Sequence, residues 1–397
     1  MIKISEYAQR IEESATMAIS ARAKAMKKAG EDVVAMAAGE PDFDTPSHIV
    51  AAAKQALDEG FTRYTPASGT PELRAAWAEQ VGRTRGVNYD PNQLIVTAGG
   101  KQAIYNIVYA LAGPGDEVII PAPYWVSYPE QVRAVGATPI ILDTSAEQDF
   151  KVNAQALREG ITDRTRLLIL NSPSNPTGSV YNQDELTALA EVLVEKQVPV
   201  LSDEVYDALV YGEDFVSIAA LGEEIYGLTI VSGAVSKTYA MTGWRIGYAA
   251  GPAEVIAAAG RLQSHSTSGP NSAAQKGALA AITGDQSAVG AMREEFDRRR
   301  QYMLQRLSAI PGITCPEPHG AFYAFPRISS YYGRHFDGQI VDGSMAFSGL
   351  LLENEKVATV PGLAFGADGH VRLSYATGMA QIEEAMNRME RFLGRLA

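Results

Sequence analysis

The chain has 397 residues and is 46% hydrophobic, so it is long enough to bury one large core and a smaller second one. Acidic residues outnumber basic ones by 46 to 34, and no run rich in Lys and Arg is present, which argues against a nucleic-acid partner. A single cysteine, Cys315, excludes an internal disulfide framework, and five scattered histidines predict no metal site. The charged N-terminus and the lack of long apolar windows predict a cytoplasmic protein without signal peptide or membrane span.

The first periodic segment is helical. Apolar positions recur at helical spacing over residues 14–29 and stop at Gly30, with Ser14 as the candidate cap. Short apolar runs follow, each with the length of a buried strand, at residues 93–98, 116–121, 137–142, 166–171, 198–203 and 228–233. Helical patterns such as 101–113 and 184–197 lie between them. Apolar strands that alternate with helices predict an α/β fold with a largely parallel sheet covered on both faces.

The pattern changes after Pro252. Long helical segments at 253–263 and 287–307 precede the strand patterns 320–325 and 370–376, which indicates an α+β tail. We interpret this tail as a second lobe that also contains the N-terminal helix. The expected division is residues 1–45 as an N-terminal arm and helix of the small lobe, 46–290 as the large domain and 291–397 as the small C-terminal domain.

Polar residues follow the ends of several predicted strands, where ligands of open parallel sheets bind. Two glycines at the turn after residues 93–98 favour an anion such as phosphate at a helix N-terminus, although the turn is neither a dinucleotide fingerprint nor a P-loop. Asp203 ends a buried strand, so it is either a cap or ion-pair partner or the counter-ion of a cationic ring nitrogen. The candidates at these strand ends are Gly99, Gly100, Lys101, Asn175, Asp203, Tyr206 and Lys237.

The stretch SKTYAMTGWRIGY, residues 236–248, places Lys237 in a segment otherwise suited to burial. Burial lowers the pKa of a lysine toward the range in which its amine is a nucleophile or a base. Together with NSPSNPTG, SDEVY and HVRLSYA, in this order and spacing, the stretch resembles the class I pyridoxal-phosphate-dependent aminotransferases of fold type I. The resemblance runs from about residue 38 to residue 376, and GGKQA, PYWVSYPE and TGWRIGYA are similar to the bacterial aspartate aminotransferase branch.

The resemblance implies a mostly parallel seven-stranded sheet in the large domain, a smaller α+β domain, and pyridoxal 5'-phosphate as cofactor. Lys237 would form the Schiff base with the cofactor and then act as the proton-transferring base. Asp203 would pair with the pyridine nitrogen, and Asn175 and Tyr206 with the ring 3-oxygen, while Trp125 stacks on the ring. Further cofactor contacts are implied for Gly99, Gly100, Lys101, Ser236, Arg245 and, from the neighbouring subunit of a homodimer with shared sites, Tyr64.

The resemblance also implies how an amino acid and its 2-oxo acid are bound. Arg372 would hold the α-carboxylate in a bidentate pair, close to the backbone of Gly39, with Trp125 and Asn175 also in contact. For the distal carboxylate the branch uses a lysine and two hydroxyls, which correspond here to Lys101, Ser14 and Thr16. This set predicts aspartate, glutamate and their 2-oxo acids as substrates.

Two positions depart from the family pattern. Members that also use prephenate often carry a basic residue where this chain has Glu12, which argues against prephenate activity. Many relatives have a phosphate-binding serine where this chain has Ala234, with Ser232 and Ser236 nearby. The alternatives are a bifunctional aspartate/prephenate enzyme, an aromatic aminotransferase, a β-lyase and, from another class, a non-catalytic cofactor-binding regulator.

Overall fold

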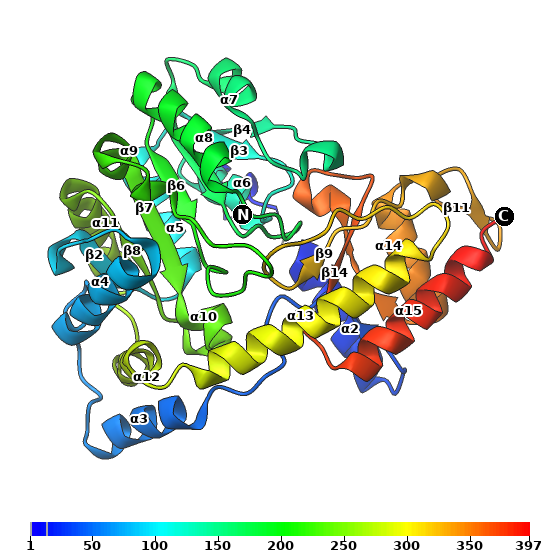
Figure 1. The fold of residues 1–397 in the computed structure, drawn as a ribbon, viewed down its shortest axis with the longest axis horizontal. Helices are drawn as coiled ribbons and strands as arrows, with labels where there is room; N and C mark the ends of the chain where they lie inside the picture. The colour runs from blue at the N-terminus through cyan, green and yellow to red at the C-terminus, as the bar shows by residue number, and fades with distance from the viewer. Residues whose placement is uncertain (1, 13–14) are drawn as a thin grey trace.

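The structure is a computed structural model that describes residues 2–12 and 15–397. Its centre is a seven-stranded sheet with the order β2-β8-β7-β6-β5-β3-β4, in which every pair is parallel except those that β8 makes with β2 and β7. The mostly parallel sheet is therefore confirmed (Figure 1). Its strands are β2 Leu94–Thr97, β3 Glu117–Pro121, β4 Thr138–Leu142, β5 Thr165–Asn171, β6 Val200–Asp203, β7 Thr229–Ala234 and β8 Gly247–Ala250.

Except at the partly exposed edge strand β4, both faces of this sheet are largely buried, which explains why its strands are continuously apolar rather than alternating. Along β5, Leu167 and Ile169 belong to one hydrophobic cluster and Leu168 and Leu170 to another, because successive side chains point to opposite faces. Helices α5 and α11 pack over the first face, and α4 and α8 over the second. Helices of this part are α3 Ser47–Asp58, α4 Pro71–Arg85, α5 Gly100–Leu111, α6 Ser127–Ala134, α7 Ala154–Gly160, α8 Gln183–Lys196, α9 Glu223–Leu228, α10 Val235–Thr238, α11 Ala253–Ser266 and α12 Ser272–Thr283.

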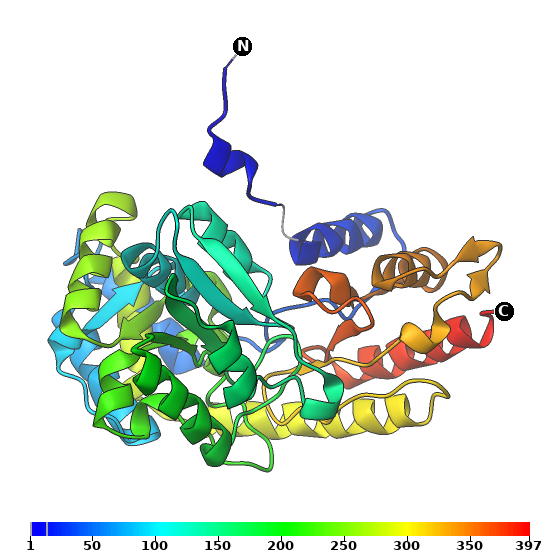
Figure 2. The same cartoon turned by 90° about the horizontal axis from the view of Figure 1, so that it is seen from above.

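A second group of elements lies beside the sheet and combines α2 and β1 with the C-terminal part of the chain (Figure 2). Strand β1 pairs in parallel with β12, which ties residues 34–35 to residues 357–358, and α2 packs against β12 and β13. The helices of this group are α2 Ala15–Lys28, α13 Ser287–Ser308, α14 Ser344–Glu355 and α15 Met379–Gly394. Its strands are β1 Val34–Ala35, β9 Tyr323–Ala324, β10 His335–Phe336, β11 Gln339–Ile340, β12 Val357–Ala358, β13 Val360–Pro361 and β14 Val371–Ser374. The short helix α1 Glu6–Gln9 instead contacts α6 beside the large sheet.

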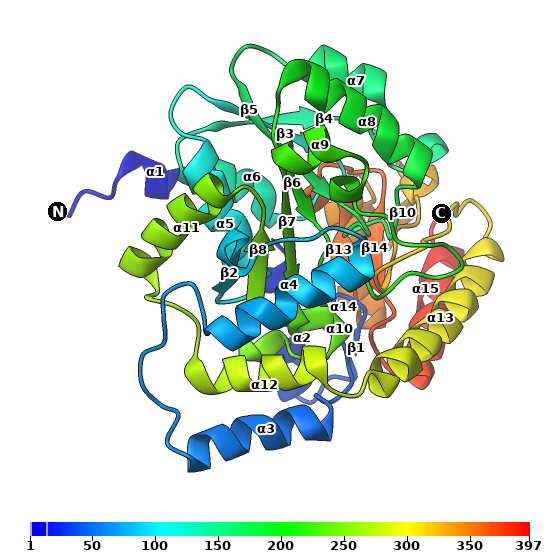
Figure 3. The ribbon, with the colours of Figure 1, turned by 60° about the vertical axis from the view of Figure 1, so that its left-hand side comes forward.

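Helices α11 and α12 follow the change of pattern at Pro252. Helix α11 packs on α5 and β2, and α12 packs on α3 and α4, so both lie with the large sheet (Figure 3). The change of pattern at Pro252 therefore begins a run of helices within residues 46–290. The division into residues 1–45, 46–290 and 291–397 stays a prediction. None of the helices in residues 2–12 and 15–397 is both long and apolar enough to cross a membrane.

Candidate active site

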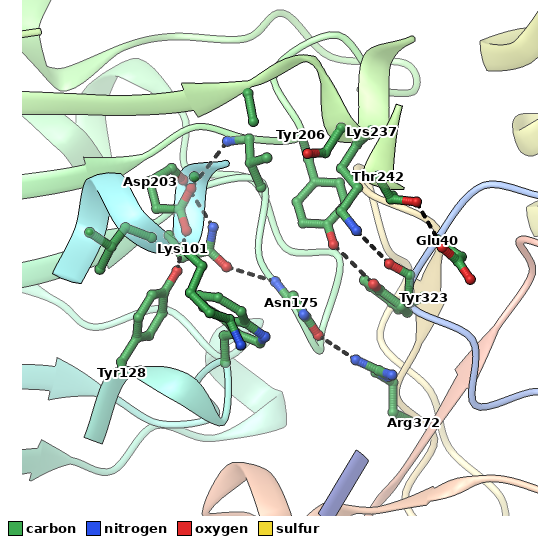
Figure 4. A pocket seen from close by; sticks show the side chains of 18 of the residues that line it. Glu40, Lys101, Tyr128, Asn175, Asp203, Tyr206, Lys237, Thr242, Tyr323 and Arg372 are labelled. Carbon is green, nitrogen blue, oxygen red and sulfur yellow. Dashed lines mark hydrogen bonds between the residues drawn. The ribbon is translucent and has the colours of Figure 1, made fainter. Parts of the chain in front are cut away.

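A cavity of about 460 Å³ lies between the large sheet and the second group of elements. The ends of β5, β6 and β7 contribute Asn171, Asp203 and Ala234, and the N-terminus of α5 contributes Gly100. Arg372 of β14 and the segment that contains Gly39 close the cavity from the other side. The cavity is therefore at the carboxyl edge of the parallel strands, where the topology predicts a ligand site (Figure 4).

Lys237 lies in α10, the single helical turn that follows β7. Its Nζ donates a hydrogen bond to the carbonyl oxygen of Gly39. Burial lowers the pKa of the Lys237 ammonium to about 8, with the Glu40 carboxylate opposing this shift and the Arg372 guanidinium adding to it. The amine is thus neutral far more often near neutral pH than that of an ordinary lysine, as a nucleophile or base requires.

Asp203 ends β6 with its carboxylate buried in the cavity. The hydroxyl of Tyr128 donates to its Oδ2 at 2.6 Å, and the N–H of Val205 approaches Oδ1 at 3.3 Å. Burial raises the pKa of the Asp203 carboxyl to about 6, and the Tyr128 hydrogen bond opposes that rise. Among the described residues no cation forms an ion pair with Asp203, so a cationic ligand atom is the partner that its chemistry favours.

The turn between β2 and α5 forms an anion-binding site with Arg245. Gly99 has a φ of +87°, and a Cβ there would lie 2.5 Å from Nη2 of Arg245, so only glycine admits the guanidinium to this position. The N-terminus of α5 begins at Gly100, whose first-turn N–H groups have no intrahelical acceptors. Arg245 donates only to backbone carbonyls, those of Thr242 at 2.9 Å and Ala98 at 3.4 Å, within the described part of the chain. A helix N-terminus next to an unneutralised guanidinium suits a phosphate group.

Arg372 is another cation of the cavity that has no carboxylate partner among the described residues. Its guanidinium is 3% exposed, donates to Asn175 Oδ1 at 2.8 Å and to the Ala37 carbonyl at 3.0 Å, and lies 4.3 Å from the ring centroid of Tyr323. Its Nε has no hydrogen-bond partner. Since a buried guanidinium is costly without an anion, this arrangement favours a carboxylate ligand.

The remaining cavity side chains fix these groups in place. Tyr206 shares a hydrogen bond of 2.9 Å with Tyr323, and both rings border the cavity. The Lys101 ammonium lies 4.9 Å from the ring centroid of Trp125, and burial together with the nearby Arg245 lowers the pKa of Lys101. This cavity edge therefore offers a partly desolvated cation beside an aromatic face.

The structure brings together most of the residues that the sequence singled out. The cavity is lined by Gly39, Gly100, Lys101, Trp125, Asn175, Asp203, Tyr206, Ser236, Lys237, Arg245 and Arg372. Gly99 contacts Arg245 from behind. Tyr64 is 96% exposed and does not line the cavity of its own chain. Ser14 lies outside the described residues, and Thr16 lies in α2 with a side chain that is also outside them.

The structure locates Ala234 and Glu12, the two positions that depart from the family pattern. Ala234 lines the cavity and its methyl group faces Gly100, and Ser236 also lines the cavity. Ser232 is buried in β7 and does not reach the cavity. Glu12 is exposed on the N-terminal arm and donates its backbone N–H to Glu130 at 2.9 Å.

Sequence reasoning missed three residues that position the site. Asn171 ends β5 as Asp203 ends β6; it donates to the Asp203 carbonyl at 2.9 Å and accepts from the Asn175 N–H at 2.8 Å. The strand-end rule applied to β5 identifies it. Tyr128 lies three residues after Trp125, in the first turn of α6, and the two ring centroids are 5.3 Å apart. The contact of Tyr323 with Arg372 depends on the tertiary pairing of β9 with β14.

Comparisons with known proteins all identify aminotransferases as similar to this chain. The family described as aminotransferase class I and II matches residues 31–389. An aspartate aminotransferase of Geobacillus stearothermophilus is 46% identical over 393 residues, which cover 99% of each chain. An aspartate/prephenate aminotransferase of Cereibacter sphaeroides is 46% identical over 401 residues and covers 100% of each. The crystal structure of the aspartate aminotransferase of Rhizobium meliloti has a TM-score of 0.97 at 41% identity, with 100% of each chain covered.

Proposed function

Because the chain belongs to the class I and II aminotransferases, we propose that it transfers the amino group reversibly between L-aspartate and 2-oxoglutarate, giving oxaloacetate and L-glutamate, with Lys237 as the attachment site for pyridoxal 5'-phosphate. One observation carries the proposal. The lowered-pKa amine of Lys237 shares a cavity with a buried carboxylate, Asp203, and with two guanidinium groups that lack carboxylate partners among the described residues, Arg245 and Arg372.

The cavity fits the cofactor on chemical grounds. Bound pyridoxal phosphate supplies an aldehyde carbon for the amine and an electron-withdrawing pyridinium ring. Arg245 and the Gly99–Gly100 turn provide the phosphate site, because glycine there admits the guanidinium against the start of α5. Asp203, with its buried carboxylate, would keep the ring nitrogen protonated. Asn175 and Tyr206 would bind the ring 3-oxygen, and Trp125 would cover the ring face.

In the proposed reaction Lys237 transfers the proton. Its Nζ, with a pKa of about 8, would hold the cofactor and, once the substrate amine has displaced it, would be free to take the proton from the substrate Cα. Arg372 clamps the α-carboxylate and so fixes which Cα–H bond faces the amine. Lys101, whose ammonium is partly desolvated beside Trp125, binds the distal carboxylate. These roles favour four-carbon and five-carbon dicarboxylic substrates.

The exposed ring of Tyr64 supports a homodimer with shared sites. A tyrosine that is 96% exposed contributes nothing to the core of its own chain, and its hydroxyl is available to a second copy. In our proposal it reaches the phosphate of the partner's cofactor. Mixing Tyr64→Ala protein with Lys237→Ala protein restores one intact site per mixed dimer, so activity of the mixture above that of either variant supports sharing. No gain on mixing contradicts it.

Borohydride trapping tests the central assignment. The cofactor-loaded protein is reduced, digested and examined by mass spectrometry, and we expect the added pyridoxyl phosphate mass on the peptide that contains Lys237. The variant Lys237→Ala should lose this label and the visible chromophore, whereas Lys196→Ala, which removes a surface lysine, should keep both. Addition of aspartate alone should release oxaloacetate in an amount equal to the sites. A label on another lysine, or no oxaloacetate, contradicts the proposal.

A further inference from the structure

Helix α2 contributes a cation to the cavity that has had no role so far. Ala21 and Lys24, three residues apart on one helical face, both line the cavity. This face of α2 therefore brings a full positive charge to the cavity lining.

Neighbouring cations of α2 do not share this direction. Arg22, two positions earlier, forms an ion pair of 2.7 Å with Glu353 of α14 and so points away from the cavity. No carboxylate of the described residues lies within ion-pair distance of the Lys24 ammonium. Lys24 lines the cavity and is otherwise exposed, so its charge is available to a ligand.

The cavity lining contains more cationic than acidic side chains. Five cationic side chains face two carboxylates, Glu40 and Asp203. In the proposed function Arg245 is matched by the cofactor phosphate, Arg372 by the α-carboxylate, and Lys237 is the reacting amine. Two cations remain, Lys101 on α5 and Lys24 on α2. A substrate with one carboxylate leaves both without an anion, whereas a dicarboxylate supplies one.

We propose that Lys24 is a specificity-determining residue, which binds the side-chain carboxylate of dicarboxylic substrates together with Lys101. The proposal rests on the proposed function and names the substrate class of the same site. Lys101 belongs to the helix that starts at the large sheet, and Lys24 to the helix that packs with β12 and β13. A bound dicarboxylate thus contacts both groups of elements, and a monocarboxylate contacts neither lysine.

The test compares Lys24→Met with wild type in the cofactor-loaded protein. Methionine keeps the unbranched stem and removes the charge, so the expected loss is specific: kcat/KM for aspartate and 2-oxoglutarate falls roughly fivefold to thirtyfold through KM, with kcat little changed. For alanine and pyruvate we expect kcat/KM within about twofold of wild type, since these substrates have no distal carboxylate. Affinity for the unreactive dicarboxylate succinate, measured from the cofactor absorbance, should fall by the same factor, and affinity for propionate should not.

Two control variants show whether the loss depends on a positive charge at position 24. Lys24→Arg keeps the charge and should recover most of the aspartate kcat/KM. Lys27→Met removes an exposed charge from the same helix outside the cavity lining and should change nothing. Equal losses for Lys24→Met and Lys27→Met, or a loss shared by alanine and aspartate, overturn the proposal for Lys24. A wild-type enzyme without preference for dicarboxylates overturns the proposed substrate as well, so the two failures are distinguishable.

Discussion

Tyr128 sets the protonation state of Asp203, and the substitution Tyr128→Phe tests this directly. The phenol hydroxyl is the side-chain donor to the Asp203 carboxylate, at 2.6 Å, and both groups are buried. Burial raises the pKa of Asp203 to about 6, while the tyrosine hydrogen bond lowers it. Phenylalanine leaves the burial intact and removes the opposing contribution. The pKa of Asp203 must therefore rise further in the variant.

The size of this shift follows from the strength of the hydrogen bond. A hydrogen bond to a buried carboxylate contributes about 1.5–3 kcal/mol, which corresponds to about one to two pKa units. Asp203 in the apoprotein is then about nine-tenths ionised at pH 7 in wild type, and between about one-half and one-tenth ionised in the variant. Since the ring nitrogen pairs with the ionised form, cofactor association at pH 7 should weaken by about twofold to tenfold.

The assay is the dissociation constant of pyridoxal phosphate, measured for the apoprotein by fluorescence titration between pH 5 and pH 9. The cofactor's own titration affects the variant and the wild type equally, so it cancels in the ratio of their dissociation constants. We expect this ratio to approach one at pH 9 and to grow as the pH falls through 7. Tyr124→Phe, which removes a neighbouring phenol without a hydrogen bond to Asp203, should give a flat ratio. A flat ratio for Tyr128→Phe as well would refute the reasoning.

Three further substitutions have defined outcomes. Arg372→Lys, which cannot form a bidentate pair, should lower kcat/KM for aspartate and alanine alike by about tenfold to a hundredfold in steady-state assays. Gly99→Ala places a Cβ 2.5 Å from a guanidinium nitrogen at a φ of +87°, so equilibrium dialysis should show at least about tenfold weaker cofactor binding, and Gly113→Ala, with open space around it, should not. Arg85→Met breaks the buried ion pair of Arg85 with Glu204, whose atoms are 2.5 Å apart, and should lower the free energy of unfolding, measured in urea, by about 3 kcal/mol. Arg166→Met breaks an exposed pair with Asp116 and should lower it by less than about 1 kcal/mol.

The sequence alone was sufficient for the strands that are apolar throughout. The six runs between residues 93 and 233 all form strands of the large sheet. In the inner strands burial on both faces leaves a continuous apolar signal, and the edge strand β4 keeps this signal although it is partly exposed. Strand β8 has no such signal. Gly247 lies against the backbone of Gly100, where a Cβ would be 2.4 Å from its nitrogen, and two alanines complete the strand. Close packing against α5 selects small residues there, and small residues carry little strand preference.

The candidate site was predictable to the extent that its residues follow strand ends. Asp203, Asn175 and Lys237 were found in this way and line one cavity. Arg372 required the resemblance, since an arginine on a strand is ordinarily an exposed ion-pair partner. Lys24 and Tyr128 required the structure, because only the packing of α2 and α6 around the cavity distinguishes them from surface and core residues. Helix spacing alone does not show which face of a helix meets a ligand.

The most direct measurement is the amino-donor profile of the cofactor-loaded protein with 2-oxoglutarate, as kcat/KM for aspartate, alanine, phenylalanine and arogenate. Because the cavity holds two cations beyond those matched by the phosphate and the α-carboxylate, aspartate should exceed alanine and phenylalanine by at least about a hundredfold. Such a profile supports the proposed reaction. An aromatic donor or arogenate that equals or exceeds aspartate contradicts the acidic-substrate assignment, even with the cofactor attached to Lys237.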